Sequence, residues 1–266
     1  MARRQERPDF PWWLVLLCGI GLWLFYEVWA NALYARVLDT LLRGIGTTLF
    51  VTVVAYGAAC LIGLCLAVAG LSRFLILRQV ARFYVEVVRG IPILVLLLYV
   101  AFVLAPALVF AVNWVGGHLG LPAWSTRDFP LIARAVIALT VAYSAFLAEV
   151  FRAGLLSVDP GQVEAAEALG LGPWQRFRHV VFPQALRVIL PPLGNDFVAM
   201  VKDSSLVSVL GVADITQLGK VMAAGNFRYF ETYNVAAFLY LVMTIGLSLI
   251  LRRFEARMRS RGQHGS

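Results

Sequence analysis

The sequence contains several apolar runs that are each close to the thickness of a lipid bilayer. A helix needs about 20 apolar residues to cross the hydrocarbon core, and an open backbone cannot cross with its polar groups unpaired. Only 14% of the 266 residues are charged and 61% are hydrophobic, whereas about 25% of an average soluble domain is charged. This composition excludes an ordinary soluble enzyme, a disordered chain and a nucleic-acid-binding domain. We therefore expect an all-α integral membrane protein.

Six runs are candidate transmembrane helices. Five are plainly apolar, whereas the run from Leu186 to Leu210 is interrupted by prolines and charged residues. The basic residues decide the count, because cytoplasmic segments of membrane proteins collect Lys and Arg. Six crossings with both termini in the cytoplasm place most basic residues inside, and five crossings would place the basic C-terminal tail outside. The runs are Trp12 to about Trp29, Leu41 to Leu71, Ile91 to Val112, Leu131 to Val150, Leu186 to Leu210 and Tyr233 to Leu251.

The first run also has features of a cleavable signal peptide. Arg3 and Arg4 precede it, and Ala30-Asn31-Ala32 follows it. Its length is at the upper limit for a signal core, and its tryptophans suit an interfacial anchor. We expect it to be retained as a signal anchor. Residues 1–39 then form a cytoplasmic N-terminus with an extra first helix, residues 40–255 the main transmembrane domain, and residues 256–266 a cytoplasmic tail.

The cysteines and histidines do not indicate a metal site or a disulfide framework. Cys18, Cys60 and Cys65 all lie inside apolar runs, where a cysteine behaves as a small hydrophobic residue. The three histidines are far apart in the sequence and lack the spacing of metal ligands. We therefore expect no bound metal.

A segment with clear signals for the start and end of a helix follows the fourth run. Asp159 can cap a helix, Pro160 suits the first helical position, and Gly170 supplies a left-handed stop. A second short helix is expected from Pro173 up to Pro183. The alanines of the first helix allow close approach of another protein's backbone. The residues alone do not choose between a docking element and an ordinary amphipathic surface loop.

Polar residues are spaced regularly along the run from Leu186 to Leu210. Asn195 and Lys202 are seven residues apart, as are Asp196 and Asp203, so each pair lies on one stripe of a helix and the two stripes adjoin. Lys202 has no acidic residue three or four positions away, so its partner must come from another helix, another subunit or the solute. This face either lines a translocation pathway or lies near the outer interface, where Lys202 and Asp203 extend toward water.

Glu149 and Arg152 form a second charged group, near the cytoplasmic end of the fourth run. Their spacing of three residues puts them on one helix face. They are either a simple ion pair beside the membrane or part of a gate or substrate contact.

Several motifs together resemble those of a known family. Glu164-Ala165-Ala166, followed by Gly170 and then by Val180-Val181-Phe182-Pro183, resembles the cytoplasmic signature of bacterial ABC-importer permeases. Other matches, which narrow the resemblance to the polar amino acid uptake branch, are Gly46-Thr47-Thr48-Leu49, Arg89-Gly90-Ile91-Pro92, Ala148-Glu149-Val150-Phe151-Arg152, Pro183-Gln184-Ala185-Leu186, Pro191-Pro192-Leu193-Gly194-Asn195-Asp196 and Lys202-Asp203-Ser204-Ser205-Leu206.

The resemblance extends from about Thr40 to Glu255, and the first run lies outside it. The departures are mild: Ile91 and Ser204 stand where the family commonly has threonine, and Phe146 where it commonly has tyrosine. These departures leave the class intact and weaken only a guess at the substrate.

The resemblance implies a type I ABC importer permease fold with a cytoplasmic coupling helix, and the distribution of basic residues gives this fold six transmembrane helices. It implies that the loop after the fourth run couples to a separate ATPase and that polar residues line the pathway of an amino acid. The coupling residues would be Asp159, Gly161, Glu164, Ala165, Ala166, Gly170 and Pro183. The pathway residues would be Glu149, Arg152, Asn195, Asp196, Lys202, Asp203, Ser204 and Ser205, of which the two serines rest on the resemblance alone.

The chain itself lacks the means to hydrolyse ATP. Gly219-Lys220 is followed by Val221 and has no upstream glycine of a phosphate loop. We therefore expect no enzyme activity and no cofactor on this chain, with ATP and Mg²⁺ bound by a partner ATPase.

The implied partners are two ATPase subunits, a second permease of the same or a homologous chain, an extracytoplasmic solute-binding protein, an amino acid and the lipid bilayer, without nucleic acid. The implied location is the bacterial inner membrane, crossed several times with both termini in the cytoplasm. The alternatives are an ion-coupled secondary transporter and a membrane scaffold protein without transport. Secondary transporters usually show repeated halves, and no repeat is visible here.

Overall fold

The computed structural model describes residues 12–120 and 122–263, and this part of the chain is helical without any strand. Four elements are not α-helices: η1 (Val100–Leu104) and η3 (Phe177–Val181) are π turns, and η2 (Thr126–Asp128) and η4 (Ser204–Leu210) are 3-10 turns. The α-helices are α1 (Trp12–Ala30), α2 (Ala32–Gly70), α3 (Leu75–Gly90), α4 (Ile93–Tyr99), α5 (Ala105–His118), α6 (Leu131–Leu156), α7 (Pro160–Ala168), α8 (Pro173–Arg176), α9 (Phe182–Asp203), α10 (Ile215–Asn226) and α11 (Tyr229–Gln263).

Four stretches of the described residues are long and apolar enough to cross a membrane: α2, the continuous α4–η1–α5, α6, and α11 as far as Phe254. A fifth crossing is formed if Pro173–Leu210 and α10, which meet at a bend of 48°, are taken together. Within α1, Val15–Ala30 is a shorter apolar helix. The multi-pass membrane fold is therefore confirmed, and the count of six crossings stays a prediction.

The helices extend beyond the predicted runs. The helix α11 continues to Gln263 rather than ending at Leu251, and α2 begins at Ala32 rather than at Leu41. Asn31 explains the early start, because its side chain accepts a hydrogen bond from the Leu33 N–H at 2.9 Å and caps the helix. A single residue thus separates α1 from α2.

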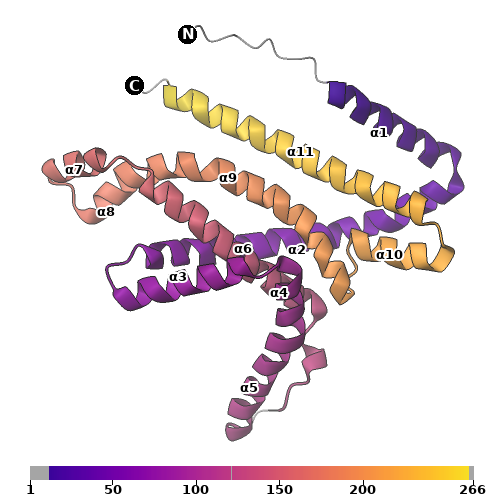
Figure 1. Cartoon of the computed structure of the whole chain (residues 1–266), viewed down its shortest axis with the longest axis horizontal. Helices are drawn as coiled ribbons and strands as arrows, with labels where there is room; N and C mark the ends of the chain where they lie inside the picture. Colours follow the sequence, from indigo (N-terminus) through magenta and orange to yellow (C-terminus); the bar gives the residue numbers. More distant parts are fainter. Residues whose placement is uncertain (1–11, 121, 264–266) are drawn as a thin grey trace.

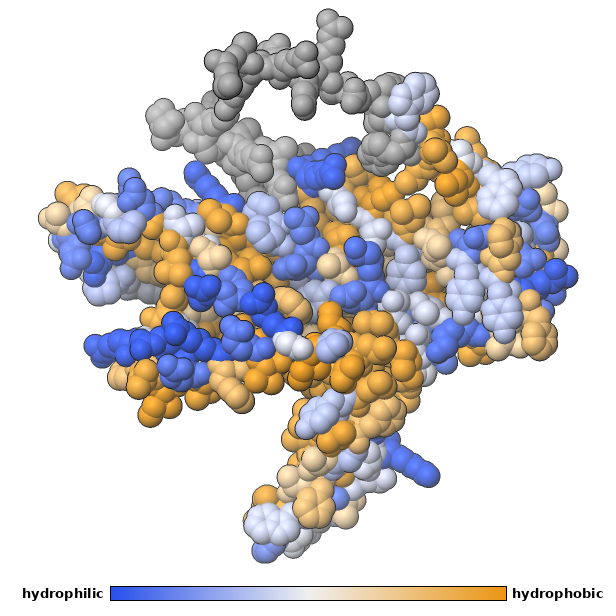
Figure 2. Space-filling model, viewed as in Figure 1, coloured by the Kyte–Doolittle hydropathy of each residue, from blue (hydrophilic) through white to orange (hydrophobic). Residues whose placement is uncertain are grey.

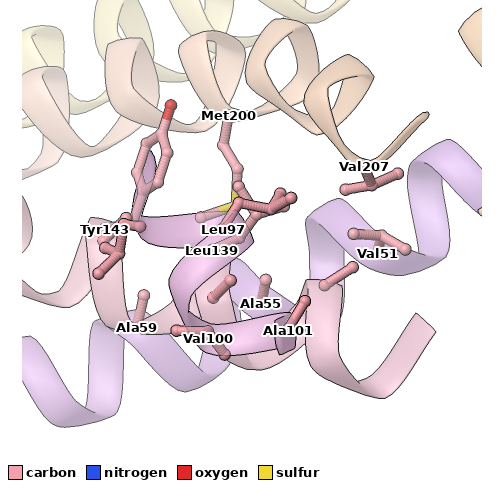
Figure 3. Packing of buried hydrophobic residues seen from close by; sticks show 14 of the residues in the cluster. Val51, Ala55, Ala59, Leu97, Val100, Ala101, Leu139, Tyr143, Met200 and Val207 are labelled. Atoms are coloured by element: carbon pink, nitrogen blue, oxygen red, sulfur yellow. The ribbon is translucent and has the colours of Figure 1, made fainter. Parts of the chain in front are cut away.

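Small residues let α2 and α6 pack closely at the centre of the molecule. Ala55, Ala59, Gly63 and Ala67, four residues apart on α2, are all buried. A Cβ on Gly63 would lie 3.0 Å from the Cβ of Leu147 on α6. Such stripes of small residues drive helix association in membranes, where lipid removes the hydrophobic advantage of burial. Figure 3 shows the adjoining core, in which Leu97, Leu139, Met200 and Val207 meet this stripe.

The sequence analysis did not predict α3. Its residues lie between two predicted runs. Their arginines interrupt the apolar residues, so a search for long apolar segments does not detect the helix. The structure shows an amphipathic helix whose Ala81, Val85 and Val88 are buried. Two further stripes flank this one: an exposed apolar stripe of Ile76, Val80, Phe83 and Val87, and a polar stripe of Arg78, Arg82, Glu86 and Arg89.

The two ends of the molecule differ in character. Figure 1 shows α7, α8 and the turn between α2 and α3 at one end, and α10 with the turn between α1 and α2 at the other. The α4–α5 arm leaves the body of the molecule at a steep angle. Figure 2 shows hydrophilic side chains gathered near α3, α7 and α8, and large apolar areas elsewhere on this face. Phe83 and Phe110 are both over 70% exposed, which suits surfaces that face lipid.

Each π turn ends two residues before a proline. Pro106 follows η1, and Pro183 follows η3. Proline has no backbone N–H, so the helix loses one backbone hydrogen bond there. A π turn is therefore less unfavourable at this position than elsewhere in a helix. The expected short helix ending at Pro183 is wrong, because α8, η3 and α9 run on without a break and Pro183 lies in the first turn of α9.

Candidate functional site

The loop after α6, residues 157–172, holds α7 through its own residues. Asp159 Oδ1 accepts a hydrogen bond from the Gly161 N–H at 2.8 Å, and Pro160 occupies the first helical position. Gly170 adopts a left-handed φ of 78°, and the Leu171 N–H reaches the Ala166 carbonyl at 3.1 Å. The predicted cap, first position and left-handed stop of this helix are confirmed.

The two faces of α7 have different surroundings. Ala166 is only 4% exposed and turns toward the chain's own helices. The expectation that all the alanines admit a partner's backbone is therefore wrong for Ala166. The outward face carries the small residues Gly161, Ala165 and Ala168 beside Glu164. This face is narrow, so another backbone can approach it closely.

An apolar patch with polar neighbours continues from α7 into α8. Leu169 is 81% exposed and Trp174 is 71% exposed. The ring of Trp174 stacks on Phe177 with centroids 5.9 Å apart. Arg176 Nη1 lies 2.6 Å from Glu167 Oε2, which ties α8 to α7. Exposed apolar residues bordered by charges are typical of protein interaction surfaces.

Glu149 and Arg152 form the expected ion pair on α6. Arg152 Nη2 lies 2.6 Å from Glu149 Oε2, and Arg152 Nε lies 3.1 Å from both carboxylate oxygens. Both side chains border a cavity of about 340 Å³ between α2, α3 and α6. Arg89 of α3 lies 5.8 Å from the ring centroid of Phe146, one turn before Glu149. The charged residues that α3 contributes here, Arg82 and Glu86, were absent from the predicted site.

The polar stripes of α9 lie in two environments. Asp203 Oδ2 accepts a hydrogen bond from Tyr143 Oη at 2.7 Å, and Figure 3 shows Tyr143 pointing from α6 toward α9. Asp196 is half-buried and interacts electrostatically with Tyr56 of α2. Asn195 and Lys202 are exposed. One stripe thus faces the chain's own tyrosines, and the other faces outward.

The remaining predicted residues divide in the same way. Ser204 is fully buried, and its Oγ donates to the Val201 carbonyl at 2.7 Å, whereas Ser205 is half-buried. Lys202 forms none of the ion pairs found among residues 12–120 and 122–263. An exposed lysine in a spanning helix requires water, a partner subunit or a solute beside it.

Arg134 is a structural residue that the sequence analysis missed. It is 7% exposed, and its guanidinium donates to the carbonyls of Phe129 at 3.0 Å, Ala101 at 3.2 Å and Thr126. Ala101 lies in the first π turn, five residues before Pro106, so the missing N–H of this proline leaves its carbonyl without a π-helical donor. Arg134 supplies that donor from α6.

The described residues contain no group of three or more His, Cys, Asp or Glu side chains that could hold a metal ion. The exposed surface of α7 and α8 suits docking, and the charged side chains of α3, α6 and α9 suit charge recognition.

Comparisons with known proteins identify the family. The family model described as binding-protein-dependent transport system inner membrane component matches residues 59–260, from within α2 to within α11. The glutamine transport system permease protein GlnP of Escherichia coli (strain K12) is 39% identical over 222 residues, which cover 82% of this chain and 93% of that protein. The probable amino-acid permease protein YxeN of Bacillus subtilis (strain 168) is 36% identical over 221 residues, covering 82% and 91%.

A solved structure of an amino acid ABC transporter with histidines is 36% identical, covers 84% of this chain and 96% of that chain, and superposes with a TM-score of 0.71. This agreement confirms the predicted type I importer permease fold. The region that the family model matches, residues 59–260, includes all the predicted site residues. The chain belongs to the family of binding-protein-dependent transport system inner membrane components.

Proposed function

We propose that this chain is the permease subunit of an ATP-driven importer that carries amino acids across the bacterial inner membrane. The observation that carries the proposal is the loop after α6, a capped helix with an exposed narrow face at the end of two spanning helices. The relatives named for glutamine and amino-acid transport support the substrate class. A family of binding-protein-dependent transport systems implies an ATPase and a solute-binding protein as partners in general.

The loop transmits motion because it is tied to the ends of α6 and α9. Val158 and Val163 pack with Val181, Ala185 and Ile189, so a displacement of α7 moves the bases of both helices. A separate ATPase that moves α7 when it binds ATP would switch the pathway from an inward-open to an outward-open state. ATP and Mg²⁺ belong to that ATPase, and the permease itself contributes no cofactor site and no hydrolytic chemistry.

The coupling contacts follow from the two faces of α7. Glu164 and Ala165, with Gly161, present the surface that the ATPase touches, whereas Ala166 anchors the helix to its own chain. Asp159 and Gly170 fix where the helix begins and ends. Pro183 sets the wide turn that joins α8 to α9.

The translocation pathway runs along the exposed stripe of α9. Asn195 and Lys202 face it, while the Asp203–Tyr143 hydrogen bond and the hydrogen bond from Tyr56 Oη to the Leu193 carbonyl hold α9 against α6 and α2. The Glu149–Arg152 pair lies farther toward α7 on α6, and Ser204 and Ser205 shape the turn that follows α9.

The complete importer contains two such permeases, identical or homologous, with two ATPases and one extracytoplasmic solute-binding protein. One chain forms only part of a pathway wall, and closed two-fold assemblies are the commonest way to complete such a wall. Both termini lie in the cytoplasm. In Figure 1, α11 ends toward the end of the molecule that carries α7, which supports this orientation.

The proposal is tested by purifying the tagged chain in a gentle detergent and identifying every subunit that co-purifies. A stoichiometric ATPase and ATP-dependent amino acid uptake by the reconstituted complex are expected. The double variant Glu164→Ala, Gly170→Val should insert normally but lose most of its uptake and its bound ATPase. The matched control is Asp39→Ala, Gly46→Ala on α2, which changes an exposed acid and a glycine with open space around it.

Normal uptake in the Glu164 and Gly170 variant would contradict the coupling role. A chain that purifies without an ATPase and moves solute on a proton or sodium gradient would contradict the importer proposal as a whole.

A further inference from the structure

A cavity of about 340 Å³ opens between α2, α3 and α6. Small residues from all three helices form its walls, which leaves the room that larger side chains would fill. Four charged side chains lie at its edge, two from α3 and two from α6. The lining residues are Leu66, Ala67, Gly70, Ala81, Arg82, Val85, Glu86, Ala148, Glu149 and Arg152.

The charges of the lining are balanced but not all paired. Glu149 and Arg152 form an ion pair with each other at 2.6 Å. Arg82 and Glu86 form none of the ion pairs found in the described part of the chain. Their order on the helix explains this, because a basic residue four positions before an acidic one is the less favourable arrangement. One free cation and one free anion, one helical turn apart, therefore border the same cavity.

The orientation of α3 places this cavity away from lipid. Its apolar stripe of Ile76, Val80, Phe83 and Val87 is exposed on the side opposite to the polar stripe. Because the exposed apolar stripe suits the hydrocarbon, the polar stripe must line a wetter space. The cavity borders that stripe, at the level of Glu149 on α6.

We propose that this cavity binds the charged backbone groups of an amino acid, with Arg82 holding the α-carboxylate and Glu86 holding the α-ammonium group. Arg82 can donate two parallel hydrogen bonds to a carboxylate, a geometry that the planar guanidinium favours. The Glu149–Arg152 pair closes one side without adding net charge. This inference rests on the proposed import of amino acids and adds to it a second group of residues, on a helix outside the predicted pathway.

A neutral ligand with both charges fits the lining better than a singly charged one. The four side chains carry a formal net charge of zero. A simple anion would leave Glu86 without a partner, and a simple cation would leave Arg82 without one, whereas a ligand that carries both charges pairs with both side chains. A phosphatidylethanolamine headgroup carries the same two kinds of charge, so the experiment must separate it from an amino acid.

The experiment uses the complete permease–ATPase complex in phosphatidylcholine nanodiscs, without ATP and without the solute-binding protein. The probes are radiolabelled L-amino acids tested one at a time, and the one that binds most tightly is carried forward. Arg82→Gln and Glu86→Gln should each weaken its binding about tenfold or more. The controls Arg73→Gln and Asp39→Asn change exposed charges outside the cavity and should leave binding unchanged.

A second readout separates charge recognition from a structural role. The α-amide of the same amino acid lacks the carboxylate, and its N-acetyl derivative lacks the ammonium group. Arg82→Gln should reduce the preference for the amino acid over the amide, and Glu86→Gln should reduce its preference over the N-acetyl derivative. A structural defect would instead weaken all three ligands equally.

Three results would overturn the inference: no amino acid binding by the wild-type complex, unchanged binding in both variants, or equal weakening of all three ligands. Binding that disappears when phosphatidylethanolamine replaces part of the phosphatidylcholine would assign the cavity to lipid and overturn it also. In each case normal ATP-driven uptake by the wild type would leave the proposed function intact, whereas absence of that uptake would be the failure of the proposed function.

Discussion

The loops before and after α6 are held in different ways. The loop before α6, residues 122–130, has a short capping box of its own at Ser125 and Asp128, and side chains from the bodies of two helices also fix it. Asn113 of α5 exchanges two 2.7 Å hydrogen bonds with the backbone of Trp124, and Arg134 of α6 donates to the Phe129 and Thr126 carbonyls. The shape of the loop after α6 is fixed by its own residues, through the Asp159 cap and the left-handed Gly170, while Val158 and Val163 pack it against the neighbouring helices.

This difference matches what the two loops have to do. A loop tied to helix bodies moves only when those helices move, so the loop before α6 keeps α5 and α6 in one arrangement. A helix that is stable by its own cap and stop keeps its shape while its position changes. Such a helix can transmit a push from another protein, which is the role proposed for α7.

The largest effect is expected from Arg134→Met, which removes the side chain that ties the loop before α6 to the helix bodies. It keeps an apolar stem but removes the side-chain donor from the buried Ala101 carbonyl and from the partly buried Phe129 carbonyl, whereas the Thr126 carbonyl keeps the Phe129 N–H. A buried group left unpaired costs about 1–3 kcal/mol. We expect a marked fall in the unfolding temperature of the detergent-purified protein, together with rapid proteolysis of residues 122–130. The control Arg127→Met changes an exposed arginine of the same loop and should change neither measurement. A stable Arg134→Met protein would mean that the guanidinium does not hold this loop.

A smaller effect is expected from Asn113→Ala. It removes both hydrogen bonds to Trp124, and an ordinary hydrogen bond contributes about 0.5–1.5 kcal/mol. Because this site is exposed, water can replace part of what is lost. Proteolysis of the loop should become faster than in the wild type but slower than in Arg134→Met. Asn113→Asp, which keeps one acceptor, should fall between Asn113→Ala and the wild type, and the reverse order would contradict this account.

The same difference explains which parts were predictable from the sequence. The limits of α7 depend on Asp159, Pro160 and Gly170, which lie within twelve positions of one another. Their conformational preferences act locally, so the cap and the stop were both found. The burial of Ala166 was not found, because it depends on the packing of α7 against α8 and η3.

Arg134 could not be recognised from its surroundings in the sequence. In the sequence it is one arginine near the start of an apolar run. Its role depends on Ala101, 33 residues earlier, whose carbonyl is free because Pro106 has no N–H. The Tyr143–Asp203 bond joins residues 60 positions apart and was missed for the same reason.

The helix α3 was missed for a different reason, since a local signal did exist. The search asked for long apolar runs, and four arginines between Arg73 and Arg89 break every such run. The periodic stripe of Ile76, Val80, Phe83 and Val87 is the pattern of an amphipathic helix. A search for periodicity would have found it and would have drawn attention to Arg82 and Glu86 on the opposite side.

The substitution Asp159→Ala has the smallest expected effect, and it tests directly whether α7 is stabilised by its own residues. Loss of a helix cap costs about 0.5–2 kcal/mol. If α7 is stabilised locally, this cost falls on α7 alone. Hydrogen exchange of the α7 amides should become several times faster, while exchange in α2 and α6 and the unfolding temperature of the whole protein stay unchanged.

Asp159→Ser provides the matched control, because serine also accepts a hydrogen bond at the cap position. It should restore slow exchange in α7 and, with it, tight coupling between ATP hydrolysis and uptake. A uniform rise of exchange across α6 and α9 in Asp159→Ala would show that α7 is part of the same cooperative unit as the spanning helices. The loop would then transmit motion by deforming those helices rather than by moving as a stable body.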